Sequence, residues 1–219
     1  MASDLPATQN LQLFKNSIDF LEKLESFGIV RFGHFEYKGK AIDGSHLHGE
    51  IFVDFRQLTT DQEIELSEYY REAITEWFEG KENLLIVGVA MGSLMLPKVI
   101  QMSLYADTGI EYAYTEKRNG VLGIYDQQAE KCRGKHLLFI EDVCNNGASS
   151  RELIREISEK KDTLGITGFS ILYGVHRGHT FFHEPKDELY AMSSLYAPAY
   201  HHSECPACEK GIPLKQYKK

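Results

Sequence analysis

Apolar residues recur at a helical spacing near the start of the chain. Between residues 11 and 27 every third or fourth position is apolar, which predicts a helix that ends at Gly28. The pattern then changes. From residue 29 to residue 55 aromatic and apolar residues are interleaved with glycines, which predicts short strands and a mobile connection.

A second helix and a series of strands are predicted in the rest of the chain. Thr60 and Glu63 have the spacing of a capping box, and apolar residues follow at helical intervals until Gly80. After this helix, short continuous apolar runs alternate with helical patterns. The runs cover residues 84–89, 111–115, 136–140 and 166–175. This alternation predicts an α/β protein whose parallel sheet is covered by helices on both faces.

Composition narrows the class of protein. The chain has 219 residues, of which 42% are apolar and 26% charged, so it can bury a substantial core. Its 24 Lys and Arg against 32 Asp and Glu give a net charge of −8, which disfavours a general nucleic-acid binder and leaves room for a local basic pocket. No apolar run is long enough for a membrane span or signal core, so we expect a cytoplasmic protein.

The strongest chemical signal lies in residues 136–150. There a strand is predicted to end in Glu141 and Asp142, and a small polar loop leads into the next helix. Residues 145–149 offer backbone N–H groups, a glycine, hydroxyls and a helix N-terminus, which together favour anion binding. Carboxylates beside an anion cradle suggest a sugar phosphate as ligand. The alternative is a solvated turn in which a serine caps the helix.

This segment resembles the phosphoribosyl-pyrophosphate (PRPP) motif of the type I phosphoribosyltransferases. In that motif four apolar residues precede two acids, two apolar residues, a Thr-Thr-Gly turn and a Ser or Thr. The chain departs from it at Asn145 and Asn146, which replace the two threonines. The resemblance implies PRPP binding by Glu141, Asp142, Asn145, Asn146, Gly147, Ala148 and Ser149.

Two further segments resemble the orotate branch of this family. Residues 88–93 are similar to its pyrophosphate loop, which adds Ala90, Met91 and Gly92 to the PRPP-binding candidates. Residues 112–117 resemble the strand that leads into its mobile catalytic loop, expected here from about 118 to 134. The resemblance implies that Lys117 and Arg118 cover the departing pyrophosphate. The alternative for Lys117 is an ordinary exposed lysine.

Other residues of the resemblance concern the base. Residues 32–40 are similar to the N-terminal motif that forms a hood over the base, which implies that Lys38 neutralises the orotate carboxylate or a phosphate. Phe52 would flank the ring. Arg177 follows a predicted core strand and offers a forked donor for a planar carboxylate. Its alternative is a surface salt bridge.

The cysteine pair near the end of the chain raises the question of a metal. His201, His202, Cys205 and Cys208 include enough ligand types for tetrahedral zinc. A single Cys-x-x-Cys lacks a second pair, and adjacent histidines do not easily bind one ion together, so the sequence favours no zinc. The remaining histidines are interpreted as surface residues: His34, His46, His48, His179 and His183.

The resemblance implies Mg²⁺-dependent transfer of phosphoribose from PRPP to orotate, with Lys117, Glu141 and Asp142 as catalytic residues. It also implies a homodimer. We expect one domain over residues 1–219, with a core at about 60–195 and a hood formed by about 29–58 and the C-terminal tail. The alternatives are a transferase for another base and a non-catalytic PRPP-binding sensor on the same fold.

Overall fold

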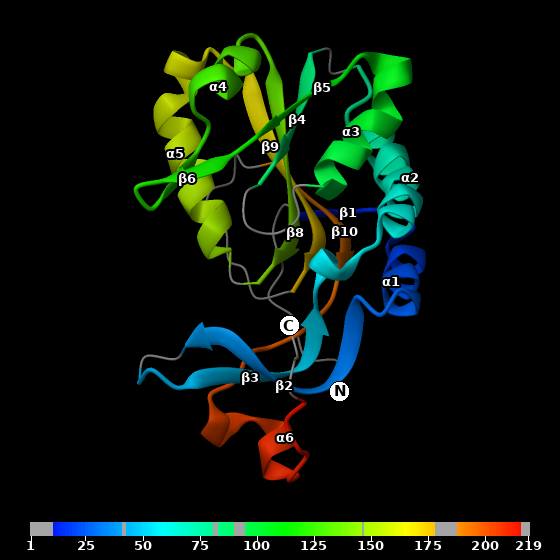
Figure 1. Ribbon diagram of the computed structural model, residues 1–219, viewed down its shortest axis with the longest axis vertical. Coiled ribbons are helices and arrows are strands. Elements are labelled where there is room, and N and C mark those ends of the chain that lie inside the picture. Colours follow the sequence, from blue (N-terminus) through cyan, green and yellow to red (C-terminus); the bar gives the residue numbers. More distant parts are fainter. Residues whose placement is uncertain are drawn as a thin grey trace.

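A six-stranded parallel sheet forms the centre of the molecule (Figure 1). The computed structural model describes residues 11–40, 43–80, 83–89, 95–145, 147–177 and 188–215. In spatial order the strands are β1 (Leu11–Leu13), β10 (Glu188–Ser194), β9 (Gly168–His176), β8 (His136–Cys144), β4 (Leu84–Gly88) and β5 (Glu111–Tyr114). Every neighbouring pair in this sheet is parallel. The predicted α/β class is therefore confirmed.

Helices cover both faces of this sheet and create two apolar cores (Figure 1). One face carries α1 (Ser17–Ser26), α2 (Thr60–Trp77) and α3 (Met95–Thr108), and the other carries α4 (Asp126–Cys132) and α5 (Ala148–Leu164). Side chains along a strand point alternately to the two faces. In β4, Ile86 joins the first core, whereas Leu85 and Val87 join the second. Burial on both faces explains why the strands are continuous apolar runs.

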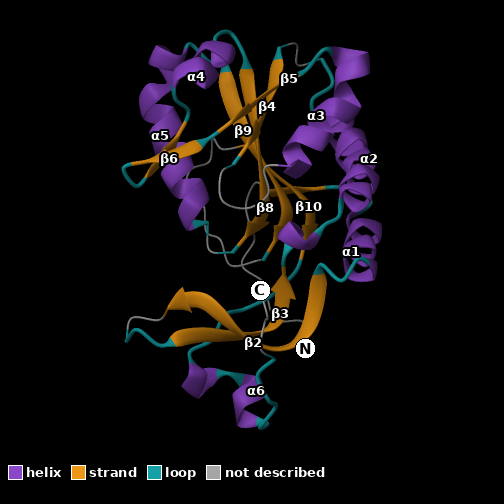
Figure 2. Cartoon of the chain, viewed as in Figure 1, coloured by secondary structure: helices purple, strands orange, loops and turns teal. Residues whose placement is uncertain are grey.

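A smaller layer lies beyond the main sheet (Figure 2). It consists of the antiparallel hairpin of β2 (Val30–Lys40) and β3 (His46–Val53), with η2 (His202–Glu204) and α6 (Pro206–Glu209) against it. His48 and Tyr200 exchange two backbone hydrogen bonds of 2.8 Å that join the hairpin to the C-terminal segment. A short helix, η1 (Phe55–Gln57), leads from the hairpin to α2. None of the helices in the described part of the chain has the length and hydropathy of a membrane span.

The first predicted helix begins later than the sequence indicated. Residues 11–13 form β1, which pairs in parallel with β10, and the helix starts only at Ser17. The helical spacing of Leu11 arises because this residue packs, half buried, against the second core as part of an edge strand. The C-terminal end of the predicted helix agrees with the structure, since Gly28 has a φ of +70°.

Three other features also differ from the prediction. The capping box of α2 lies one residue earlier, because the Thr59 hydroxyl accepts from the Gln62 N–H while the Gln62 side chain accepts from the Thr59 N–H. The loop expected at 118–134 contains ordered elements, namely α4 and most of the hairpin formed by β6 (Glu116–Arg118) and β7 (Val121–Gly123). Strand β10 was not predicted.

Candidate functional site

The two adjacent carboxylates lie inside a strand. β8 was predicted to end in the acid pair, but it continues two residues further, to Cys144. Strand geometry therefore sends their side chains to opposite faces. Glu141 Oε2 accepts a hydrogen bond of 2.8 Å from the Ser150 hydroxyl on α5. Asp142 lies on the side of α2, where its charge acts on the buried Tyr70 hydroxyl.

Burial makes both carboxylates reluctant to ionise. Loss of water around Glu141 raises its pKa to about 7, although the hydrogen bond from Ser150 acts in the opposite direction. Burial also raises the pKa of Asp142, and the 2.8 Å hydrogen bond from the Val143 N–H and the charge of Arg56 oppose that shift. Ligand hydroxyls or a cation next to Glu141 and Asp142 would favour the ionised carboxylates.

Two residues that the sequence analysis did not single out shape the surroundings of Asp142. Arg56 forms a 2.6 Å ion pair with the buried Asp54, and its charge also reaches Asp142. Gly174 of β9 lies so close that a Cβ atom there would be 2.7 Å from the Asp142 carbonyl oxygen and 2.8 Å from the Tyr70 hydroxyl. In the sequence, Asp54 and Arg56 stand close together directly after β3, and this pair of opposite charges could have drawn attention to Arg56.

The start of α5 offers backbone N–H groups near the acid pair. Its N-cap residue is Gly147, whose φ of +67° is left-handed and which has no side chain to cap the helix. The first turn contains no acidic residue. The initial N–H groups of this 17-residue helix and its dipole therefore suit an anion. Ser149 is exposed in this first turn, as the cradle requires.

Arg177 connects the loop after β8 to the β2–β3 hairpin and to the C-terminal segment. It is only 8% exposed, so the alternative of a surface salt bridge is wrong. Its Nη1 donates to Asn145 Oδ1 at 2.7 Å, and its Nη2 donates to the Tyr37 hydroxyl at 2.8 Å and the Ala197 carbonyl at 2.6 Å. The guanidinium also lies 4.7 Å from the Tyr37 ring centre. Among the described residues, the buried Nε–H has no hydrogen-bond acceptor.

Aromatic side chains of the β2–β3 hairpin lie next to this arginine. Phe52 on β3 lies with its ring centre 5.5 Å from that of Phe35 and 6.5 Å from that of Tyr37. Because Tyr37 also accepts from Arg177, the structure brings the Phe52 face of the hairpin and the loop after β8 into one region. The backbone of Lys38 follows Tyr37 in β2.

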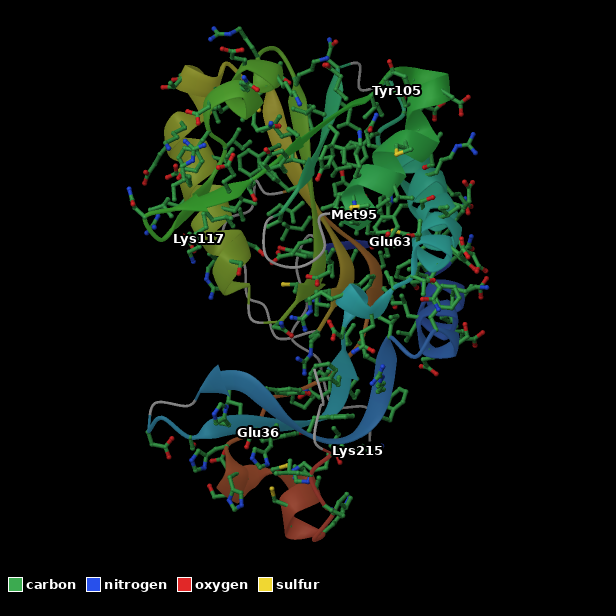
Figure 3. The ribbon with its side chains drawn as sticks, in the orientation of Figure 1. Glu36, Glu63, Met95, Tyr105, Lys117 and Lys215 are labelled. Carbon is green, nitrogen blue, oxygen red and sulfur yellow. The ribbon has the colours of Figure 1, made fainter. Side chains whose placement is uncertain are left out.

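The two predicted lid cations lie on the β6–β7 hairpin. Lys117 is exposed on β6, in front of α5 (Figure 3). Arg118 is engaged locally, since its Nη2 lies 2.6 Å from Asp126 Oδ2 and 3.0 Å from Glu116 Oε2. The hairpin is fixed to α5 by a 3.1 Å hydrogen bond from the Leu122 N–H to a carboxylate of that helix. This bond places the β6–β7 hairpin against the first turns of α5, the helix whose Ser150 donates to Glu141.

Several predicted residues cannot be placed. Ala90, Met91, Gly92 and Asn146 lie outside the described residues, as do the side chains of Lys38 and Ala148. Strand β4, which precedes Ala90, ends beside the acid pair. Its last residue, Gly88, pairs with Ile140, and the Val89 N–H donates to the Ile140 carbonyl at 3.2 Å.

The histidines behave differently from the prediction. His34 and His48 were interpreted as surface residues, but they are 2% and 5% exposed. They lie beside the cysteines of the C-terminal segment. His201 instead binds Asp43 at 2.9 Å through Nε2 and the Ser203 hydroxyl at 2.7 Å through Nδ1. The spacing of residues in sequence gave no signal for this arrangement, because the hairpin and the tail are far apart in the chain.

Comparison with known proteins gives a consistent class. No protein-family model matches the chain. An orotate phosphoribosyltransferase of a Thermoanaerobacter species is 25% identical over 196 residues, which cover 90% of this chain and 94% of that protein. Among solved structures, adenine phosphoribosyltransferase from Saccharomyces cerevisiae has a TM-score of 0.55 at 12% identity, over 81% of this chain and 98% of that one. Orotate phosphoribosyltransferase from Francisella tularensis has a TM-score of 0.51 at 18% identity, over 80% and 82%.

The parallel sheet, the helices on both faces and the loop after β8 define the phosphoribosyltransferase fold. The likeness in sequence extends over nearly the whole length of the chain and of its relative. The chain therefore has the phosphoribosyltransferase fold and is similar in sequence to orotate phosphoribosyltransferases.

Proposed function

We propose that the protein transfers phosphoribose from PRPP to orotate, giving orotidine 5′-monophosphate and pyrophosphate. The observation that carries this proposal is the pair of half-buried carboxylates on β8 beside the glycine-capped start of α5. Acids that accept from ribose hydroxyls and amides that bind a phosphate are the two recognition elements of a ribose 5-phosphate group. Both occur at the carboxyl end of the sheet, where α/β proteins bind ligands.

The reaction asks for positioning and electrostatic stabilisation. Glu141 and Asp142 would accept hydrogen bonds from the ribose hydroxyls, and their negative charge would stabilise the cation-like ribose of the transition state. The first N–H groups of α5, with Asn145 and Ser149, would bind the 5′-phosphate. Arg177 would hold Asn145 in place through the 2.7 Å hydrogen bond between their side chains.

Magnesium fits this donor set. Glu141 and Asp142 supply hard carboxylate oxygens in a half-buried, poorly hydrated setting that favours a nearby cation, and such oxygens are preferred ligands of Mg²⁺. When bound with PRPP, the ion would neutralise negative charge on the pyrophosphate. The carboxylates would hold it directly or through the ribose hydroxyls.

Two features support orotate as the base. The buried Nε–H of Arg177 has no acceptor among the described residues, and a carboxylate oxygen would supply one. Lys38 lies on the same hairpin as Tyr37 and Phe52, and the hairpin would form the hood. A base without a carboxylate would not form ion pairs with Arg177 and Lys38. The orotate enzymes among its relatives support the same choice.

A homodimer is part of this proposal. Helix α3 exposes Met95, Met102 and Tyr105, which lie on one side at spacings of seven and three residues. Exposed apolar side chains grouped in this way suit a protein interface.

A second candidate is a PRPP-binding protein that does not transfer the sugar. The ion pairs of Arg118 with Asp126 and Glu116 favour it, because they engage a cation that would otherwise cover pyrophosphate. Retention of both acids and of Lys117 favours the enzyme. The two candidates differ in turnover and agree in PRPP binding.

The decisive assay mixes the purified protein with Mg²⁺, PRPP and orotate and follows the ultraviolet absorbance of orotate as it becomes a nucleotide. Parallel reactions contain adenine, uracil or no base. We expect turnover with orotate alone. Turnover only with another base would replace orotate, and calorimetric PRPP binding without any turnover would favour the second candidate.

Replacing Lys117 by alanine should lower kcat by about 10- to 100-fold and change the dissociation constant of PRPP by less than about threefold, because its charge would act mainly on the leaving pyrophosphate. Lys131, an exposed lysine on the neighbouring α4, is the matched control, and K131A should keep normal turnover. Equal activity of K117A and K131A would assign Lys117 to the ordinary surface. Stopped-assay kinetics with titration of PRPP distinguish these results.

A further inference from the structure

Four potential metal ligands meet between the hairpin and the C-terminal segment. His34 on β2 and His48 on β3 face Cys205 and Cys208, and their ligand atoms all lie within 4.8 Å of one another. His34 Nε2 is 3.0 Å from His48 Nδ1 and 3.6 Å from Cys205 Sγ. Cys208 Sγ is 3.4 Å from His34 Nε2 and 3.2 Å from His48 Nδ1.

These distances match the edges of a small tetrahedron. Zinc bonds of about 2.0 Å to nitrogen and about 2.3 Å to sulfur place neighbouring ligand atoms about 3.3 to 3.8 Å apart. The four separations given above, from 3.0 to 3.6 Å, lie within or just below this range. Two thiolates and two imidazoles are a common ligand set for structural zinc.

The surroundings hold the ligands in the orientation that a metal requires. His34 Nδ1 lies 2.6 Å from the Ile212 carbonyl oxygen, which accepts the Nδ1–H and leaves the lone pair on Nε2 directed at the cluster. The paired backbone hydrogen bonds between His48 and Tyr200 fix the second histidine. Cys205 is 2% exposed and is the N-cap residue of α6, so the turn of that helix brings Cys208 back to the same point.

We propose that His34 Nε2, His48 Nδ1, Cys205 Sγ and Cys208 Sγ bind one structural zinc ion. The two thiols lose their protons when the ion binds, and the two imidazoles bind as neutral rings. Four protein ligands complete the tetrahedron and leave no position for a substrate, so the site is not catalytic. The ion links the hairpin to the C-terminal segment and thereby holds the layer that carries Tyr37.

The first test is the metal content of the untagged wild-type protein, purified without chelators and measured by inductively coupled plasma mass spectrometry. We expect about one zinc per chain, retained on gel filtration. After removal of zinc, added Co²⁺ should give the intense visible absorption of tetrahedral cobalt bound to thiolates. Absence of metal together with absence of this cobalt spectrum overturns the proposal, as does stoichiometric iron or copper in place of zinc.

Variants then identify the ligands. H48A and C208S should each retain less than about a tenth of the wild-type zinc. H201A and C132S are the matched controls and should retain all of it, because His201 binds Asp43 and Cys132, the last residue of α4, is buried in the core on the α5 side of the sheet. Full zinc in H48A, or loss in H201A, would overturn this ligand set. Circular dichroism of each variant identifies any loss that arises from unfolding, and in that case the cobalt spectrum of the wild-type protein decides. These readouts are independent of transferase activity.

Discussion

Replacing Glu141 by glutamine is expected to stabilise the protein above neutral pH while removing the proposed transferase activity. The folded protein holds the Glu141 proton with a pKa of about 7, against 4.5 for an unperturbed glutamate. The folded state therefore binds more protons than the unfolded state between these values, and stability falls as the pH rises from about 4.5 through 7. Glutamine has no such proton to lose and can still accept from Ser150. E141Q should gain about 1 to 3 kcal/mol at pH 8 and little at pH 4.

The same substitution removes a negative charge from the proposed ribose site. We expect kcat/KM for PRPP to fall by at least about 100-fold, since an amide neither stabilises positive charge on ribose nor favours magnesium. Thermal unfolding at pH 4 and pH 8, together with the orotate assay, measures both effects. Glu130, exposed on α4, supplies the control, and E130Q should change neither quantity. An active E141Q protein would remove Glu141 from the site.

Replacing Arg177 by alanine is expected to damage both stability and binding. The substitution leaves Asn145 Oδ1 and the Ala197 carbonyl without their donor and opens a cavity next to Tyr37. Loss of these hydrogen bonds in a buried setting should lower the free energy of unfolding by about 2 to 4 kcal/mol. The Michaelis constants of orotate and PRPP should both rise by about tenfold or more, because Asn145 also loses its support.

The control for Arg177 is Y37F, which removes one acceptor and leaves Nη2 bonded to Ala197. Its cost should be about 1 kcal/mol, with smaller changes in the Michaelis constants. Urea unfolding and steady-state kinetics on both variants give the comparison. Normal kinetics in R177A at a temperature where it is folded would show that Arg177 serves the fold alone.

The sequence predicted the fold class and the location of the site well, for a physical reason. Strands buried on both faces are apolar at every position, so β4 and the first half of β8 were visible as continuous runs. Glu141 and Asp142 interrupt such a run, which made them conspicuous. The sequence did not show that both acids lie within β8. The length of β8 depends on its pairing with β9, which extends from His136 to Cys144.

Features that depend on distant partners were missed. Leu11 has helical spacing relative to the residues after it, yet its pairing with Leu189 decides that it is in a strand. The position of His34 shows the same limit. In sequence it is one histidine among polar and aromatic residues, and only the folded chain places it beside Cys205. Local spacing carries no information about such contacts.

The pairing of β1 with β10 also determines when the chain can complete its fold during synthesis. Among the described residues, the earliest strand, β1, pairs with the latest strand of the sheet, β10, and the hairpin at residues 30–53 likewise waits for residues 200–208. The β1 edge of the sheet and the contact of the hairpin with the C-terminal segment cannot form on a nascent chain that lacks residues 188–208. The central strands can assemble earlier, so the nascent protein passes through a state with an open sheet edge and an unfinished hood.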